Sequence, residues 1–178
     1  MRATLDSSGE IDSTITARAI IGVVWKPNVT VAAIVERKRR FLLVEEETSE
    51  GIRLNQPAGH LEPDESIVAA AQREMLEETA YDFVAEQLVG VYRWSKPGSE
   101  LTYLRFAFSG RLGVHHSERP LDTGIIRTVW LSHDEILASV AQHRSPLVVR
   151  CVEDYLAGHR FSIDALVETG GSNASLAR

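Results

Sequence analysis

The sequence predicts an α/β sandwich with a mixed sheet. Short apolar runs typical of strands and amphipathic stretches typical of helices follow one another in mixed order, rather than in separate blocks. The chain has 178 residues, which is enough for one domain with a substantial core. Hydrophobic residues make up 44% and charged residues 25% of it, as in an ordinary globular protein.

The first half of the domain is predicted to form a hairpin, a loop and a helix. Two apolar runs at 29–35 and 41–44 flank a charged tip, which favours a hairpin. Residues 48–63 contain several glycines and prolines and are expected to form a loop. A helix is expected from about 65 to 79, with Asp64 as its N-cap. Its apolar stripe consists of Ile67, Val68, Ala71 and Met75.

The second half is predicted to begin with two strands, at 88–94 and 101–111, joined by a turn that contains Pro97 and Gly98. In the second of these strands, alternation places one set of side chains on one face: Thr102, Leu104, Phe106 and Phe108. The opposite face carries Tyr103, Arg105 and Ala107. A further strand is expected near 127–131.

Two helices are predicted to close the domain. Residues 132–135 have the sequence of a capping box, so a helix is expected to begin there. Pro146 suits the first turn of the last helix, and Gly158 suits its end. Cys151 lies among apolar residues of this helix and is expected to be a core residue rather than a nucleophile.

The two ends of the chain have a different composition. Residues 1–24 are expected to be an N-terminal extension, polar and mobile up to residue 14 and followed by an apolar segment that suits an added edge strand. Residues 25–168 form the predicted domain, and 169–178 a flexible tail. No apolar stretch is long enough for a membrane-spanning helix.

Charge and cysteine content limit the partners and the compartment. The net charge is −6, and the basic run at 37–40 suits a solvated hairpin tip better than a nucleic-acid footprint. We therefore expect a small-molecule substrate and neither a nucleic acid nor a membrane as partner. The single cysteine excludes an intramolecular disulfide, which fits a cytoplasmic protein. A monomer and a homodimer both remain open.

Three glutamates carry the chemistry. Glu74, Glu77 and Glu78 stand at positions i, i+3 and i+4 of the predicted helix, so their carboxylates share one face. Like charges at this spacing repel each other unless a cation lies between them. Carboxylate oxygens select hard cations, which predicts Mg²⁺, with Mn²⁺ as a possible substitute. The alternative is a solvated acidic helix face.

The residues around these glutamates form a longer pattern, from Gly59 to Tyr81, which we name the acidic motif. It runs Gly59-x₅-Glu65-x₇-Arg73-Glu74-Met75-Leu76-Glu77-Glu78-Thr79-Ala80-Tyr81 and resembles the Nudix box. The chain differs from the box at Ala80, where glycine is usual and serves the helix exit, so a shifted C-cap is expected. The resemblance implies a Nudix-type α/β/α sandwich that hydrolyses phosphoanhydride bonds.

The resemblance also implies roles for individual residues. Glu77 and Glu78 are expected to be metal ligands, and Glu74 either a third ligand or the general base. Arg73 and Glu65 are expected to form an ion pair that orients the loop on the helix. Two further residues are expected near the metal: Ala58 through its backbone, and Asp122 as an added acidic ligand or base, although a turn aspartate is otherwise unremarkable.

Strings outside the motif resemble the NudJ branch of bacterial phosphatases: Pro27 to Ala32, Asn55 to Glu62, Leu104 to Phe106 and Arg144 to Val148. That branch removes terminal orthophosphate from nucleoside tri- and diphosphates and acts on hydroxymethylpyrimidine diphosphate.

Three residues outside the motif are substrate-binding candidates, each with a structural alternative. Arg105 suits a phosphate or a sheet surface. His60 suits a phosphate or solvent. Tyr103, like Tyr92 and Trp94, suits a stacked base or ordinary packing, with packing favoured.

Two other functions compete. One is a Nudix pyrophosphohydrolase of another substrate class, acting on a sugar nucleotide or a dinucleoside polyphosphate. The other is a non-catalytic nucleotide sensor of the same fold. Intact glutamates at 74, 77 and 78 disfavour the sensor. The sequence leaves the physiological substrate open.

Overall fold

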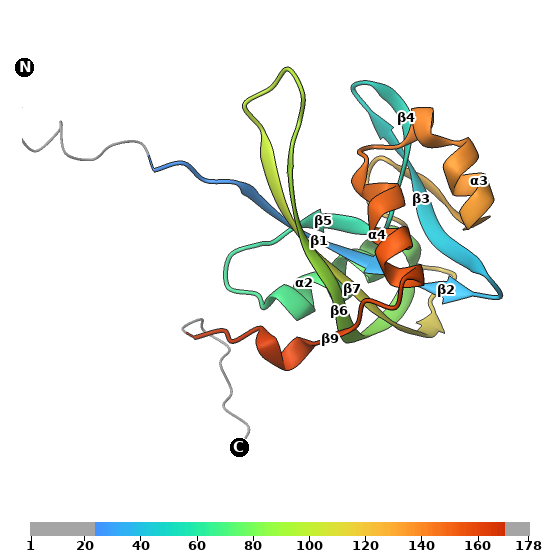
Figure 1. The fold of residues 1–178 in the computed structure, drawn as a ribbon. Helices are drawn as coiled ribbons and strands as arrows, with labels where there is room; N and C mark the ends of the chain where they lie inside the picture. The colour runs from blue at the N-terminus through green and yellow to red at the C-terminus, as the bar shows by residue number, and fades with distance from the viewer. Residues whose placement is uncertain (1–23, 170–178) are drawn as a thin grey trace, which may run out of the picture.

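In the computed structural model, which describes residues 24–169, the strands form two sheets (Figure 1). The larger sheet has the strand order β5-β1-β7-β6-β9. These strands are β1 (Asn28–Ile34), β5 (Ala58–His60), β6 (Tyr81–Ser95), β7 (Thr102–His115) and β9 (Phe161–Ser162). Only the pair β1 and β7 is parallel among these pairings, so the predicted mixed sheet is confirmed. The hairpin between β6 and β7 projects well beyond the body of the molecule (Figure 1).

The smaller sheet is antiparallel and is built around β3 (Arg40–Thr48). β3 pairs with β2 (Glu36–Arg37), β4 (Gly51–Asn55) and β8 (Ile125–Ser132). The predicted loop at 48–63 was therefore partly wrong, because it contains both β4 and β5. These two strands are short and Pro57 separates them, so their stability comes from pairing with β3 and β1 rather than from their own sequence pattern.

Helices cover both faces of the larger sheet. The helices are α2 (Ile67–Thr79), α3 (His133–Ala138) and α4 (Leu147–Leu156), with short 3-10 turns at Val140–Gln142 and Ile163–Ala165. Ala71 and Met75 of α2 pack with Phe108 in one core cluster. Val148 and Cys151 of α4 pack in a second cluster that also contains Ala107. The expected α/β/α sandwich is therefore confirmed, as is Cys151 in the core.

The alternation of β7 links the two clusters. Phe106 and Phe108 belong to the cluster on the α2 side, and Ala107 between them belongs to the cluster on the α4 side. This agrees with the faces predicted for the strand. Arg105 lies one residue before Phe106 and is therefore directed to the α4 side, toward β3 and β4.

The ends of α2 differ from the prediction. The helix begins at Ile67, and its N-cap is Ser66, whose hydroxyl accepts a hydrogen bond from the backbone of Ala69. Asp64 was wrong as the N-cap because its φ of 65° is left-handed, whereas an N-cap is extended. At the other end Ala80 keeps the left-handed conformation, with φ of 57°, so the expected shift in C-cap geometry was also wrong.

The remaining boundaries follow the predicted order. The Ser132 capping box is present, and α4 begins after Pro146 and ends just before Gly158. Both β6 and β7 are longer than predicted. β6 begins at Tyr81, and the prediction missed the alternation of the buried Phe83 and Ala85 with exposed residues, whereas β7 continues to His115 through mostly exposed residues. Nearly all of the expected N-terminal extension, with its edge strand, and the tail from residue 170 lie outside the described residues. Within residues 24–169 no helix has both the length and the apolar character needed to cross a membrane.

Candidate active site

Arg73 connects the loop of the acidic motif to α2. Its Nε and Nη2 donate to the two oxygens of Glu65 at 3.0 and 2.7 Å. Its Nη1 donates to Glu74 and Glu77 at 2.8 and 2.9 Å. A fifth hydrogen bond runs from Nη2 to the carbonyl oxygen of His60 at 3.0 Å. The guanidinium therefore joins the turn before the helix, the helix entry and the acidic face into one network.

The turn at Ala58 and Gly59 lies directly against the acidic face of α2. The backbone N–H of Ala58 donates to Glu78 Oε2 at 2.8 Å. A Cβ atom at Gly59 would overlap the carboxylate of Glu74, so any larger residue would displace that carboxylate from its present position. The motif therefore uses Gly59 to let the backbone approach a carboxylate closely.

Four carboxylates lie near one another at this turn, and all of them except that of the exposed Asp122 are partly withheld from water. The pKa of Glu78 is raised to about 8, chiefly by burial and to a smaller extent by the nearby Glu74, Glu46 and Asp122, while the Ala58 N–H opposes the shift. Burial likewise raises the pKa of Glu74. Asp122 is held at the exit of α2 because its backbone N–H donates to the carbonyl of Glu77 at 2.9 Å.

This donor set fits a hard divalent cation. The side chains of Glu74, Glu77, Glu78 and Asp122 all end in carboxylates, whose oxygens are the ligands that such a cation prefers. No three His, Cys, Asp or Glu side chains of residues 24–169 are already gathered as a closed ligand set. Instead, Arg73 donates hydrogen bonds to Glu74 and Glu77, and the Ala58 N–H donates one to Glu78. A cation would offset both the burial of these carboxylates and their mutual repulsion, which together raise the pKa values of Glu74 and Glu78.

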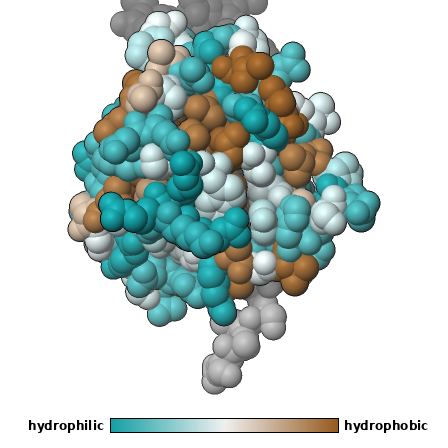
Figure 2. Space-filling view, turned by 90° about the vertical axis from the view of Figure 1, so that its right-hand side faces the viewer, coloured by the Kyte–Doolittle hydropathy of each residue, from teal (hydrophilic) through white to brown (hydrophobic). Residues whose placement is uncertain are grey.

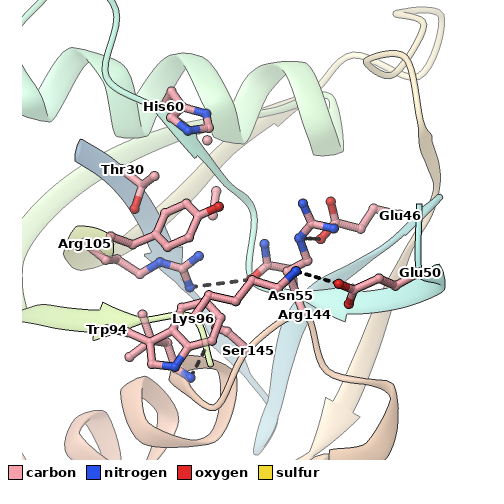
Figure 3. Close-up of a pocket in the computed structure, with 14 residues that line it drawn as sticks. Thr30, Glu46, Glu50, Asn55, His60, Trp94, Lys96, Arg105, Arg144 and Ser145 are labelled. Atoms are coloured by element: carbon pink, nitrogen blue, oxygen red, sulfur yellow. Dashed lines mark hydrogen bonds and ion pairs between the residues drawn. The ribbon is translucent and has the colours of Figure 1, made fainter. Parts of the chain in front are cut away.

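A cavity of about 210 Å³, which we name the central pocket, opens beside the turn (Figure 3). Strands of both sheets contribute to it, from β1 and β7 on one side to β3 and β4 on the other. Its lining comprises Thr30, Glu46, Glu50, Asn55, Ala58, Gly59, His60, Trp94, Lys96, Tyr103, Arg105, Arg144, Ser145 and Leu147. Because Ala58 and Gly59 belong to this lining, the pocket and the acidic motif share a boundary.

Arg105 is a buried cation in this pocket. Only 7% of the residue is exposed, and burial lowers its pKa. Its Nη1 lies 3.5 Å from Asn55 Oδ1 and 3.4 Å from Gln56 Oε1, and its Nε has no partner. No carboxylate of residues 24–169 lies within salt-bridge distance of it. The sheet-surface alternative for Arg105 was therefore wrong, and its donors are suited to an anion.

Of the three candidate aromatics, two line the pocket. Trp94 and Tyr103 are paired across β6 and β7, and their rings stack with centroids 5.7 Å apart and planes 21° apart. Tyr92 instead donates to Asp154 on α4. Trp94 and Tyr103 therefore pack against each other and also line the pocket. His60 is exposed and lies at the edge of the pocket beside the turn.

Several residues of the pocket escaped the sequence analysis. Thr30 lies opposite Arg105 in the parallel register of β1 and β7, a long-range pairing that no local pattern reveals. Glu46 belongs to the acidic run 45–47, whose neighbours face solvent. The one available signal was strand alternation after the buried run 41–44, which directs Glu46 and Glu45 to opposite faces.

Comparison with known proteins gives one family. The family model described as NUDIX domain matches residues 25–151. Phosphatase NudJ of Escherichia coli K12 is 37% identical over 142 residues, which cover 80% of this chain and 92% of the relative. A NUDIX hydrolase from Nitrosomonas europaea matches with 53% identity and a TM-score of 0.79, covering 81% of this chain and 98% of the other.

A more distant structure shares only the fold. The MutT NUDIX hydrolase from Burkholderia pseudomallei has a TM-score of 0.63 at 17% identity, over 73% of this chain and 98% of the other.

Proposed function

Because this chain belongs to the Nudix family and is a hydrolase of phosphoanhydride bonds, we propose that it removes terminal orthophosphate from nucleoside tri- and diphosphates. We propose Mg²⁺ as its cofactor, with Mn²⁺ as a substitute. The relative's name, phosphatase, supports orthophosphate release. Hydroxymethylpyrimidine diphosphate is a further proposed substrate, from the resemblance to the NudJ branch.

One observation carries the proposal: the turn at Ala58 and Gly59, which contacts Glu78 and Glu74 of α2, lines the same pocket as Arg105. An anhydride is a chain of negative charges, so it needs cationic partners along its length. Arg105 offers a guanidinium without a carboxylate partner. The carboxylates that contact the turn at Ala58 and Gly59 fit a cation. A diphosphate lying between the two would meet positive charge at both ends.

The residues of the motif have distinct proposed roles. Glu77 and Glu78 would hold the cation, and Glu74 would be a third ligand or the general base. The backbone of Ala58 and the side chain of Asp122 would complete the set. A bound divalent cation supplies charge neutralisation and orientation of the phosphates.

Around these ligands, Arg73 and Glu65 fix the turn on the helix, as their paired hydrogen bonds allow. His60 and Tyr103 at the pocket wall would contact the substrate beside Arg105.

The phosphorus that water attacks can be determined directly. We would follow GTP hydrolysis by ³¹P NMR in ¹⁸O-water, with Glu78→Gln as the inactive control. We expect GDP and labelled orthophosphate first, and GMP in a second step. Direct release of pyrophosphate and GMP would contradict orthophosphate removal and leave the family assignment intact.

A second candidate has one observation in its favour. A cavity of about 590 Å³ adjoins the central pocket, and the two share Glu50, Trp94, Lys96, Arg144 and Ser145. This gives space for a second head group, as in a sugar nucleotide or a dinucleoside polyphosphate. Such an enzyme would split UDP-glucose into UMP and glucose 1-phosphate without free orthophosphate, which the same NMR experiment distinguishes.

A further inference from the structure

Unpartnered polar atoms concentrate in the central pocket. Among residues 24–169, five buried side-chain polar atoms have no hydrogen-bond partner, and three of these belong to residues lining the pocket. They are Thr30 Oγ1, Glu46 Oε1 and Arg105 Nε. A buried polar atom without a partner is costly, and such atoms are rare in native proteins. Their concentration in one cavity indicates that a ligand supplies the missing partners.

Arg105 and Glu46 need opposite partners. The Arg105 Nε is a donor, and the phosphates of the proposed substrate can satisfy it. An ionised Glu46 can only accept hydrogen bonds, so a phosphate would be repelled from it. Its nearest cation is Arg144, whose Nε lies 3.7 Å from Glu46 Oε1, too far for a hydrogen bond. The part of the substrate that meets Glu46 must therefore carry N–H or O–H donors.

The walls beside Glu46 indicate the shape of that part. Trp94 and Tyr103 present stacked, planar rings, which suit a flat heteroaromatic group. Figure 3 shows Asn55 and Arg144 between Trp94 and Glu46, across the pocket from Thr30. Arg144 can donate to a ring nitrogen next to the group that Glu46 accepts. One edge of such a ligand would therefore carry a hydrogen-bond donor, which meets Glu46, next to an acceptor, which meets Arg144.

We propose that Glu46 is the specificity-determining residue of this enzyme, accepting an N–H of an amino-substituted heteroaromatic head group. The inference rests on the proposed function, because it takes the head group to enter the central pocket. Cytosine presents an amino group beside a ring nitrogen acceptor. Uracil presents an oxygen at the amino position, and this oxygen would oppose the Glu46 carboxylate. Cytidine nucleotides should therefore bind better than uridine nucleotides.

The matched pair of ligands is cytidine and uridine 5′-(α,β-methylene)diphosphate, which differ only at that edge and resist hydrolysis. Isothermal titration calorimetry with the full chain and Mg²⁺ gives the two dissociation constants. We expect the wild type to prefer the cytidine compound by about tenfold or more, since paired contacts to a base edge discriminate on this scale. Glu46→Gln, which offers both an acceptor and a donor, should reduce the ratio to about twofold or less.

The neighbouring residue provides the control. Glu45 directs its side chain to the other face and pairs with Arg127 at 2.6 Å, so Glu45→Gln should keep the wild-type ratio. Equal affinities in the wild type would overturn the proposal without any variant, as would a ratio unchanged in Glu46→Gln or binding of neither compound. GTP hydrolysis, measured in parallel, tests the proposed function separately. Intact hydrolysis with equal affinities would overturn the role of Glu46 alone.

Discussion

Arg73 and Arg105, the two arginines of the site, differ in whether carboxylates of the chain neutralise their charge. Arg73 makes five hydrogen bonds, four of them to carboxylate oxygens, and the bond to Glu65 raises its pKa. Arg105 has two long contacts to amide oxygens and an unpartnered Nε, and burial lowers its pKa. The network around Arg73 is complete within the chain, and the network around Arg105 is not.

This difference separates structural charge from charge kept for a ligand. A satisfied ion network stabilises the fold, and removing its centre leaves several charges without partners. A buried cation without a counter-ion costs free energy in the unliganded protein, and that cost is recovered when an anion binds. Substitution of Arg73 should therefore have the larger effect on stability, and substitution of Arg105 should have the larger effect on ligand binding and activity.

The largest effect is expected for activity at Glu78. Glu78→Gln preserves the shape of the side chain but removes a proposed ligand charge, so kcat should fall by about 100-fold or more while the fold stays intact. Steady-state hydrolysis of GTP and circular dichroism measure the two properties. Glu86→Gln on the exposed part of β6 is the control and should retain full activity. A near-wild-type kcat in Glu78→Gln would refute the ligand assignment.

A large effect on stability is expected at Arg73. Arg73→Ala leaves three carboxylates without their cation, so the free energy of unfolding should fall by about 2–3 kcal/mol, below the range for fully buried pairs because Arg73 keeps 24% side-chain exposure. Urea titration measures it. Arg127→Ala breaks an exposed ion pair and should cost less than about 1 kcal/mol. Equal losses in the two variants would show that the Arg73 network contributes no more than a surface pair.

The raised carboxylate pKa values predict a pH dependence of stability. The folded state keeps a proton on Glu78 up to about pH 8, whereas the unfolded chain releases it near its ordinary value of 4.5. The folded state therefore binds more protons across this interval, and stability should fall as the pH rises from 5 to 8. Melting temperatures in EDTA test this expectation. Glu78→Gln should flatten the slope, and a rise in wild-type stability over the interval would contradict the shift.

The smallest effect is expected at the exit of α2. Ala80 has φ of 57°, a conformation that costs an L-residue about 1 kcal/mol or more and glycine almost nothing. Ala80→Gly should therefore stabilise the protein by about 0.5–1 kcal/mol, after loss of a buried methyl group. Ala85→Gly, in a strand with ordinary backbone angles, should destabilise it. A loss of stability in both would indicate that packing at Ala80 outweighs its strain.

Local sequence patterns predicted the features that depend only on residues close together in the sequence. The acidic face of α2 follows from helical spacing alone, and the capping box at Ser132 from four consecutive residues. The N-cap at Ser66 was missed because Asp64 and Ser66 are both good capping residues, and only the backbone angles distinguish them.

The central pocket depends on pairings between distant segments, so sequence predicted little of it. Thr30 and Arg105 meet through the register of β1 with β7, and Trp94 and Tyr103 through that of β6 with β7. Glu46 lines the pocket from β3, at a point where the pairing of β3 with β4 is regular but its pairing with β8 shifts register between Glu45 and Glu46. The spacing of residues along the sequence does not predict any of these strand pairings, although alternation along β7 did predict the face on which Arg105 lies.

The central claim is that Arg105 serves a ligand rather than the fold, and one thermal-shift comparison of Arg105→Met with wild type tests it. We expect the free variant to melt no lower than wild type, because a costly buried cation has been replaced by an apolar side chain of similar length. We also expect that guanosine 5′-(α,β-methylene)diphosphate with Mg²⁺, which should raise the wild-type melting temperature, shifts the variant little. A free variant that melts well below wild type and keeps the full nucleotide-induced shift would contradict the account.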